Sequence, residues 1–425
     1  MGGLLPHSPA ASIAPWRWGV VWLLFLATMI NYMDRQTMQA TSDHLIREFF
    51  AGKERGYGQV ESAFQYAFAF AQIAAGFFVD RFNVRWLYVG ALMVWSAAGL
   101  VTGLVSTIEA LILCRVVLGM AEAFNWPCAV SVVRRVIPLE ARSLANGIFH
   151  SGASIGAALT PILAWLMIGP NGENWRTIFI VVGAAGLVWV LLWLLIVRGD
   201  RARAVERQDE TPADAAFVLP PMPFSRVLLG RLFWITLMVS LTVNFCWHFF
   251  RAWLPRILRK DLDYTESEML WMLAAFFVAA DVGSMLAGWA TRKLTTVGFS
   301  VERSRKLVST ATSLMCLLAI PLAFDPPAWL AVVLVLVVAA GAMGGFANMF
   351  ALAQETAPRH TAKVVGLVGS LPWLLLALLN PIIGGQADET GTFAFSLFCV
   401  AFVPLAGSLV GWLWPETGPG PNGTS

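Results

Sequence analysis

The chain has 425 residues, of which 58% are hydrophobic and 13% are charged, and its formal net charge is +3. Soluble domains average about 25% charged residues, so this composition excludes a soluble protein and indicates an integral membrane protein. A net charge this small gives no reason to expect a nucleic-acid partner. The five cysteines lie in apolar segments without paired spacing, which favours neither a disulfide framework nor a metal site.

Twelve apolar segments are long enough to cross a bilayer as helices, which takes about 20 residues each. The longest polar stretch, residues 198–226, divides these segments six and six. We therefore expect an all-α membrane protein with an N-terminal six-helix bundle (1–197), a cytoplasmic linker (198–226) and a C-terminal six-helix bundle (227–425) that ends in a short disordered tail. The segments are 16–38, 58–79, 86–106, 109–133, 143–168, 175–197, 229–255, 267–291, 306–323, 328–353, 364–386 and 391–414.

Lys and Arg are unequally distributed between the two sides of such a protein. With both termini and the linker on one side, that side holds 19 basic residues and the other side holds 7. Basic residues favour cytoplasmic loops, so both termini are predicted to be cytoplasmic. The remaining three basic residues, Arg35, Arg115 and Arg251, lie within predicted helices.

The first apolar segment ends in an unusually polar stretch, "MINYMDRQTMQ". Asp34 and Arg35 stand side by side in it, one turn after Tyr32. A charged side chain at the centre of a bilayer costs at least about 2.5 kcal/mol. Such a cost is usually retained for function, so this stretch is predicted to contribute to a site.

A short charged motif, "GFFVDRFNVRW", follows the second segment. It resembles the cytoplasmic signature of the major facilitator superfamily, G-x-x-x-D-R-x-G-x-R, with Gly76, Asp80, Arg81 and Arg85 in place. Asn83 replaces the second glycine, and Asn also tolerates the left-handed backbone that a tight turn can require. The resemblance implies a gating motif that holds two helix ends together and releases them when the bundles rock.

The fourth segment carries two further charges, Arg115 and Glu122, seven residues apart. This spacing is two helical turns, about 10 Å along one face, and Asn125 continues that face. Charges inside lipid should point into the bundle and find partners. A structural ion pair between helices remains an alternative to a functional role.

The longer pattern "AEAFNWPCAVSVVRRVIPLEARSLANGIFHSGASIGAALTPIL" resembles the fourth and fifth spans of anion:cation symporters, and most closely the bacterial hexuronate transporters. The stretch "AADVGSMLAGWATRKLTTVGFSVERSRKLV" is similar to another pattern of that family. The resemblance implies a monomeric transporter in the bacterial inner membrane that needs no cofactor and uses the proton gradient. Its partners would be a small organic anion and protons, and it would not be an enzyme.

A mechanism follows from these residues. Arg35 is the leading ligand for a substrate carboxylate, with Tyr32 on the same helix face, because a guanidinium binds carboxylate in a bidentate manner. Asp34 and Glu122 are the expected proton-coupling groups, since burial favours the neutral acid and a neighbouring arginine favours the carboxylate. In the empty state, Arg35 and Arg115 should be neutralised by Asp34 and Glu122.

The remaining candidates concern the sugar hydroxyls and a possible second charge. Tyr66 is implied by its family position, and His150 and His248 stand where the family has other residues. Arg251 is expected to extend to the membrane surface or, alternatively, to bind a second anionic group. Asp281 is assigned equally to a structural and a coupling role. The polar candidates for substrate binding are Tyr32, Arg35, Tyr66, Arg115, His150, His248, Asn348 and Asn380.

Several rival functions were compared with import of a hexuronate such as glucuronate or galacturonate. Galactonate, glucarate or a sulfonated sugar would suit the same mechanism. An effluxer is disfavoured because "GASIGAALTPILA" lacks the antiporter element of its superfamily. A membrane enzyme would need a metal or nucleophile cluster, and the five scattered histidines offer none.

Overall fold

The computed structural model describes residues 14–138, 141–168, 173–206, 224–356 and 361–413, and within these ranges the chain forms helices and no strands. In the first half these are α1 (Pro15–Ala40), α2 (Ser42–Phe50), α3 (Glu54–Arg81), α4 (Val84–Thr102), α5 (Ile108–Glu122), α6 (Asn125–Val136), α7 (Arg142–Ile168), α8 (Trp175–Ile196) and α9 (Asp200–Glu206). In the second half they are α11 (Phe224–Leu228), α12 (Arg231–Lys260), α13 (Glu266–Thr296), α14 (Val301–Cys316), the 3₁₀ helix η2 (Leu317–Phe324), α15 (Ala328–Thr356), α16 (Thr361–Thr390) and α17 (Ala394–Gly411).

Eleven of the twelve predicted membrane-spanning segments are confirmed. In the described part of the chain, eleven helical segments are long and apolar enough to cross a membrane, with α5 and α6 forming one segment and α14 and η2 another. The twelfth is α1, whose 26 residues span about 39 Å. Its polar end lowers its hydropathy, but it packs against α7 and α8 like the other helices of its bundle.

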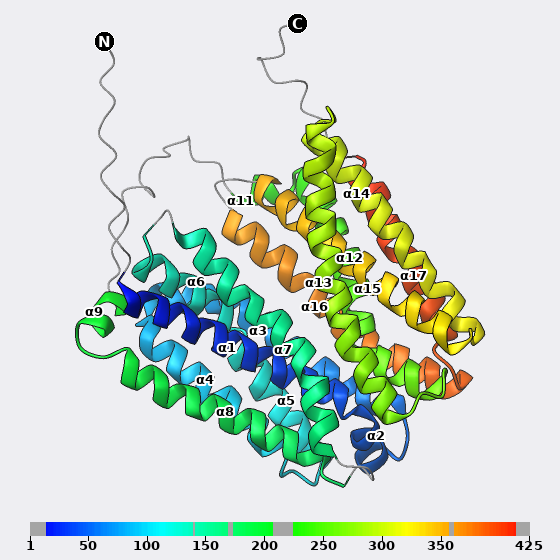
Figure 1. Ribbon diagram of the computed structural model, residues 1–425, viewed down its shortest axis with the longest axis horizontal. Coiled ribbons are helices and arrows are strands. Elements are labelled where there is room, and N and C mark those ends of the chain that lie inside the picture. The colour runs from blue at the N-terminus through cyan, green and yellow to red at the C-terminus, as the bar shows by residue number, and fades with distance from the viewer. Residues whose placement is uncertain (1–13, 139–140, 169–172, 207–223, 357–360, 414–425) are drawn as a thin grey trace, which may run out of the picture.

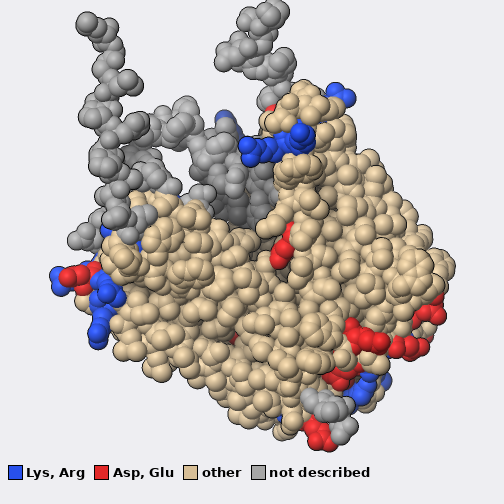
Figure 2. Space-filling model, viewed as in Figure 1, with Lys and Arg blue, Asp and Glu red and all other residues tan. Residues whose placement is uncertain are grey.

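The helices form two bundles that meet near α2 and diverge toward the ends where α9 and α11 lie (Figure 1). The pairs α3–α16 and α7–α13 make the main contacts between the bundles. On the face shown in Figure 2, charged side chains gather at the ends of the molecule, and the surface between them is almost uncharged. This pattern is expected of a protein whose middle faces lipid.

Local sequence explains one break in a helix and one close contact between two helices. The predicted segment 109–133 is interrupted after Glu122, because Pro127 lacks the backbone N–H that would bond to the preceding turn. Gly152 and Gly156 form a G-x-x-x-G spacing on α7. A side chain at either position would collide with the backbone of α1, so these glycines allow α7 and α1 to pack closely.

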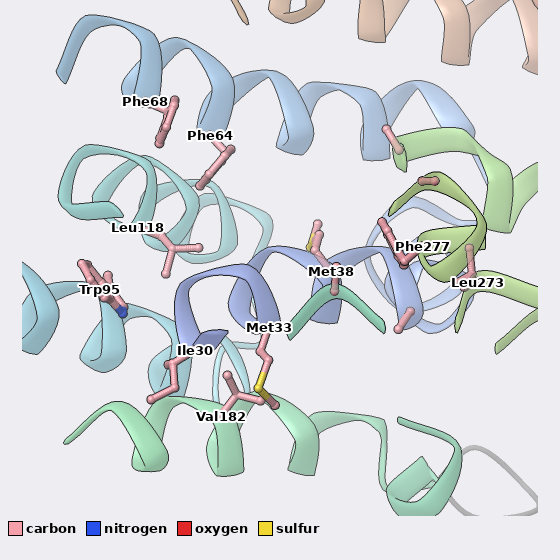
Figure 3. Close-up of a cluster of buried hydrophobic side chains, with 14 of the residues drawn as sticks. Ile30, Met33, Met38, Phe64, Phe68, Trp95, Leu118, Val182, Leu273 and Phe277 are labelled. Atoms are coloured by element: carbon pink, nitrogen blue, oxygen red, sulfur yellow. The ribbon is translucent and has the colours of Figure 1, made fainter. Parts of the chain in front are cut away.

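Apolar side chains hold the N-terminal bundle around α1. Figure 3 shows Ile30 and Met33 of α1 pointing toward Val182 of α8, within the continuous buried core. Phe64 and Phe68 of α3 belong to the same core and face the charged part of α1. Arg35 of α1 is therefore enclosed by aromatic rings rather than by lipid.

Candidate functional site

A cavity lies between the two bundles. Small-molecule sites often lie at interfaces of this kind between domains. The N-terminal bundle contributes residues of α1 and α7 to its wall, and the C-terminal bundle contributes residues of α12, α13, α15 and α16. Its lining includes Tyr32, Arg35, Gln36, His150, Ser154, Trp247, His248, Arg251, Asp281 and Trp373.

Arg35 is the central charge of the N-terminal wall. Its Nε donates a hydrogen bond to Glu122 Oε2 at 2.6 Å, and both side chains are almost completely buried. The guanidinium carbon lies 4.4 Å from the ring centroid of Phe68 and 5.3 Å from that of Tyr32. Arg35 Nη2 has no hydrogen-bond partner among the described residues. One side of the guanidinium is thus engaged, and one nitrogen is free to bind a ligand.

The helix break after Glu122 shapes this pair. Glu122 is the last residue of α5, and Asn125, the first residue of α6, fixes the turn that follows. Asn125 Oδ1 accepts a hydrogen bond from Tyr88 at 2.7 Å, and its Nδ2 donates to Thr28 at 3.2 Å. Glu122 therefore stands on a segment tied to both α1 and α4, opposite Arg35.

Asp34 does not form the expected pair with an arginine. It is buried, and among the described residues its Oδ2 has no hydrogen-bond partner. A Cβ added to Gly99 of α4 would lie 2.7 Å from Asp34 Oδ1, so the carboxyl group occupies space that only glycine leaves open. Asp34 faces α4, away from the cavity wall, and the partner predicted for Arg35 or Arg115 is supplied by other carboxylates.

Glu61 of α3, which the sequence analysis did not single out, is one of these carboxylates. It is fully buried and lies 3.7 Å from Arg115 Nη2 and 3.4 Å from Arg251 Nη2. Gln39 also donates a hydrogen bond to its Oε1 at 3.0 Å. One acid thus links an arginine of its own bundle to an arginine of the other bundle. The signal was available in the sequence, since Glu61 is the one acid in the apolar run 58–79.

The C-terminal wall is built around Trp373. Its ring centroid lies 4.1 Å from that of His248. Arg251 Nε donates to His248 Nδ1 at 3.2 Å, which requires that nitrogen to be an acceptor and leaves Nε2 as the donor of a neutral imidazole. The expectation that Arg251 extends to the membrane surface is wrong, because the residue is 4% exposed and contacts Glu61 inside the protein.

A second polar contact joins the two bundles at the cavity. Ser154 Oγ of α7 donates to Asp281 Oδ1 of α13 at 2.8 Å. His150 lies one turn before Ser154 and packs edge-on against Trp126 at 4.8 Å between ring centroids. The structure therefore brings His150 and Asp281 to the same cavity as Arg35.

Other predicted residues lie away from the cavity. Asn380 donates to Gln65 at 3.0 Å and accepts from Trp253 at 3.1 Å, so its side chain is occupied between helices. Asn348 lines a separate pocket within the C-terminal bundle. Tyr66 is half-buried and is not among the residues that line the cavity.

The gating motif joins α3 to α4. Gly76 and Arg81 lie on α3, with Arg81 exposed, and the side chain of Asp80 lies outside the described residues. Arg85 Nη1 is 3.2 Å from Glu206 Oε1 on α9, so the motif contacts the start of the linker. Asn83 has φ −63° rather than a left-handed value, and its side chain caps α4 by accepting from the Arg85 N–H.

The end of the molecule near α2 is closed by contacts between the bundles. Arg256 of α12 bonds to Glu54 of α3, with Nη2 2.6 Å from Oε1, and also pairs with Asp43 of α2. Arg259 Nε lies 2.6 Å from Asp43. Asp388 of α16 accepts the backbone N–H of Glu54 at 2.8 Å, which satisfies a free donor at the start of α3.

The amino-acid sequence matches known proteins along most of its length. The family model described as Major Facilitator Superfamily matches residues 24–381. A D-galactonate transporter of Escherichia coli O6:H1 is 28% identical, covering 91% of this chain and 93% of its own. The hexuronate transporter of Escherichia coli K12 is 26% identical, covering 93% of each. A probable galactarate/D-glucarate transporter of Bacillus subtilis is 25% identical, covering 95% of this chain and 92% of its own.

Solved structures share the fold. A bacterial homolog of the human lysosomal transporter Spinster, in an inward-facing and occupied conformation, superposes with a TM-score of 0.74 and 18% identity, covering 94% of this chain and 97% of its own. The xylose transporter XylE from E. coli, in an inward open conformation, gives 0.74 with 14% identity, covering 95% of this chain and 97% of its own.

Proposed function

The chain belongs to the Major Facilitator Superfamily, and we propose that it imports a sugar-acid anion together with protons by alternating access. The names of its relatives support the substrate class, since they are described as transporters of galactonate, hexuronates, galactarate and glucarate. Proton coupling is supported by the buried acids around the cavity. A hexuronate such as glucuronate or galacturonate is the substrate that we propose first.

The observation that carries this proposal is the state of Arg35. A buried guanidinium on a cavity-lining residue, held by one acid and with one nitrogen unpaired among the described residues, is suited to exchange that acid for a substrate carboxylate. When Glu122 takes up a proton, its attraction for Arg35 falls. The substrate carboxylate then replaces it as the partner of Arg35, with Tyr32 beside the bound group.

Charge balance links the protonation of an acid to the binding of substrate. Three arginines (Arg35, Arg115, Arg251) and two acids (Glu61, Glu122) are joined by buried ion pairs, and a third buried acid, Asp34, faces α4. A monoanion that enters this cluster adds a negative charge, and a proton on an acid restores neutrality. An unpaired buried charge costs several kcal/mol, so a half-loaded cavity resists the change of access. Asp34 is the second group that we propose to take up a proton.

The direction of transport rests on the proposed topology. With both termini in the cytoplasm of a bacterium, the closed end near α2 faces the periplasm and the bundles diverge toward the cytoplasm. The structure would then be the inward-facing state, from which substrate and proton leave. Opening of the Arg256–Glu54 and Arg259–Asp43 contacts would give the outward-facing state.

Uptake by purified protein in proteoliposomes tests the proposal. With the interior at pH 7.5 and the exterior at pH 5.5, D-glucuronate, D-galacturonate or D-galactonate should accumulate above its external concentration, and a protonophore should abolish the accumulation. Equilibration without accumulation would point to a facilitator. No uptake or binding of any sugar acid would overturn the proposal.

A further inference from the structure

Two buried guanidinium groups, one from each bundle, face the same cavity with a nitrogen to spare. Arg35 Nη2 and Arg251 Nη1 both lack hydrogen-bond partners within the described part of the chain, and each side chain is 4% exposed. Both residues line the cavity. A buried guanidinium N–H normally has a hydrogen-bond partner, so the two unpaired nitrogens call for an explanation.

The two guanidinium groups lie close enough for one small molecule to reach both. Each guanidinium carbon is 5.8 Å from the centroid of the same Trp373 ring, so their separation cannot exceed twice that distance. Two like charges in a buried site repel each other. The acids that offset this repulsion, Glu122 and Glu61, contact each arginine by other nitrogens.

The positive charge of Arg251 is less well compensated by nearby acids than that of Arg35. Arg35 has Glu122 at 2.6 Å, whereas Arg251 is 3.4 Å from Glu61, which also lies 3.7 Å from Arg115. A single carboxylate thus serves two cations, and an anionic ligand at Arg251 would give each cation its own partner. His248 accepts from Arg251 Nε and Glu61 accepts from its Nη2, so Nη1 is the nitrogen that remains for an anionic ligand.

We propose that, besides the monoanionic sugar acids named above, the cavity takes a small dianion, an open-chain sugar acid with a carboxylate at each end, held with one carboxylate on Arg35 and the other on Arg251. This inference rests on the proposed function and specifies the substrate class of the same cavity. The two carboxylates would bridge the bundles, while His248 Nε2 and Tyr32 offer hydrogen bonds to hydroxyls between them. Asp281 of α13, on the same wall as His248, accepts from Ser154 and offers its remaining oxygen to a hydroxyl group.

The test compares two ligands that differ at one end only. Galactarate and D-galactonate have the same configuration at their four middle carbons, and galactarate has a second carboxylate where galactonate has a hydroxymethyl group. Dissociation constants measured by isothermal titration calorimetry at one pH should show galactarate binding about 10-fold more tightly or better, as one additional charge-assisted contact provides. A wild-type protein that binds galactonate as tightly as galactarate would overturn the inference.

The double variant Arg251→Gln/Glu61→Gln removes one acid and one base together, so the net charge of the buried cluster is unchanged, and Arg115 keeps its cation–π contact with Phe64. Its galactarate affinity should fall to the level of galactonate, while its galactonate affinity should stay within about 3-fold of the wild type. Equal losses for both ligands would mean that the pair is only structural and would overturn the inference.

A matched control is available on the same two helices. Glu54→Gln/Arg256→Gln removes another acid–arginine contact between α3 and α12, at residues that do not line the cavity. This variant should keep the wild-type ratio of the two affinities, and loss of that ratio would contradict a specific role for Arg251. Transport of galactonate without any binding of galactarate would refute the dianion and leave the proposed function intact, whereas no binding of either ligand would count against both.

Discussion

The two bundles contribute different chemistry to the cavity. The N-terminal bundle holds Arg35 and the two acids that pair with buried arginines, Glu61 and Glu122, as well as the buried Asp34. The C-terminal wall offers Arg251, which donates a hydrogen bond to His248. Both side chains contact the ring of Trp373. This difference suggests that proton exchange belongs to the N-terminal bundle, and that the C-terminal bundle selects the shape and charge of the ligand.

Among the variants below, Arg35→Lys should have the largest effect, because it changes the central charge of the N-terminal wall. A lysine ammonium is a point charge and cannot hold Glu122 by one nitrogen while offering a second, fixed nitrogen to the ligand. The affinity for a sugar acid should fall about 10- to 100-fold in calorimetric titrations. Arg17→Lys, the same change on the same helix beside Trp16 and outside the cavity, is the control. An unchanged dissociation constant for Arg35→Lys would rule out the carboxylate clamp.

Trp373→Ala tests the C-terminal wall. The ring contacts His248 and lies under both guanidinium groups, so its loss should weaken binding about 10-fold through stacking and cation–π contacts. The number of protons moved per substrate should not change, because the acids remain. The control is Trp329→Ala, at a residue that is 69% exposed. A change in proton stoichiometry would show that the two walls do not have separate roles.

A substitution at the closed end near α2 should have a smaller effect. A Cβ added to Gly384 of α16 would lie 2.6 Å from the backbone oxygen of Glu54, whereas at Gly385 it would meet only the Arg55 side chain at 3.6 Å. Gly384→Ala should therefore destabilise the closed end by about 1–3 kcal/mol, and Gly385→Ala should be nearly neutral.

Spin labels at Arg47 and Glu389, on α2 and α16, report on this change. Cys399, the exposed cysteine among the described residues, is first replaced by serine. The distance distribution should shift to longer values in Gly384→Ala and stay at the wild-type value in Gly385→Ala. Identical distributions in the two variants would show that the close approach of α3 and α16 does not hold this end shut.

Tyr66→Phe should have the smallest effect. Tyr66 does not line the cavity, so loss of its hydroxyl group should change sugar-acid affinity by less than about 2-fold in the same titrations. A loss above about 10-fold would instead place Tyr66 at the ligand in another state of the transport cycle.

The fold was predictable because each span needs a long apolar segment, and such segments are visible in the sequence. Which residues face one another was less accessible. Asn348 and Asn380 both looked like ligand groups, yet the structure places them in a separate pocket and in a contact with Gln65 and Trp253. In helices that are apolar all round, hydrophobic periodicity does not reveal which side faces the cavity.

The buried charges show the same limit. Arg35 and Glu122 were predicted to belong to one cluster because each is costly inside a membrane, and the structure pairs them directly. Glu61 lies only three residues inside the predicted segment 58–79, where an acid can reach the membrane surface, and its burial comes from contact with Arg251 of the other bundle. The acid itself was visible in an apolar run, but its contact with a distant segment leaves no local pattern in the sequence.

The central claim, that Glu122 couples proton movement to binding at Arg35, is tested most directly by comparing exchange with accumulation in Glu122→Gln. Proteoliposomes preloaded with unlabelled substrate should still exchange it for labelled substrate, because the neutral glutamine mimics the protonated acid. Under a pH gradient the same variant should not accumulate substrate, whereas Glu109→Gln, the same change at an exposed position of α5, should accumulate it like the wild type. Full pH-driven accumulation by Glu122→Gln would contradict the account.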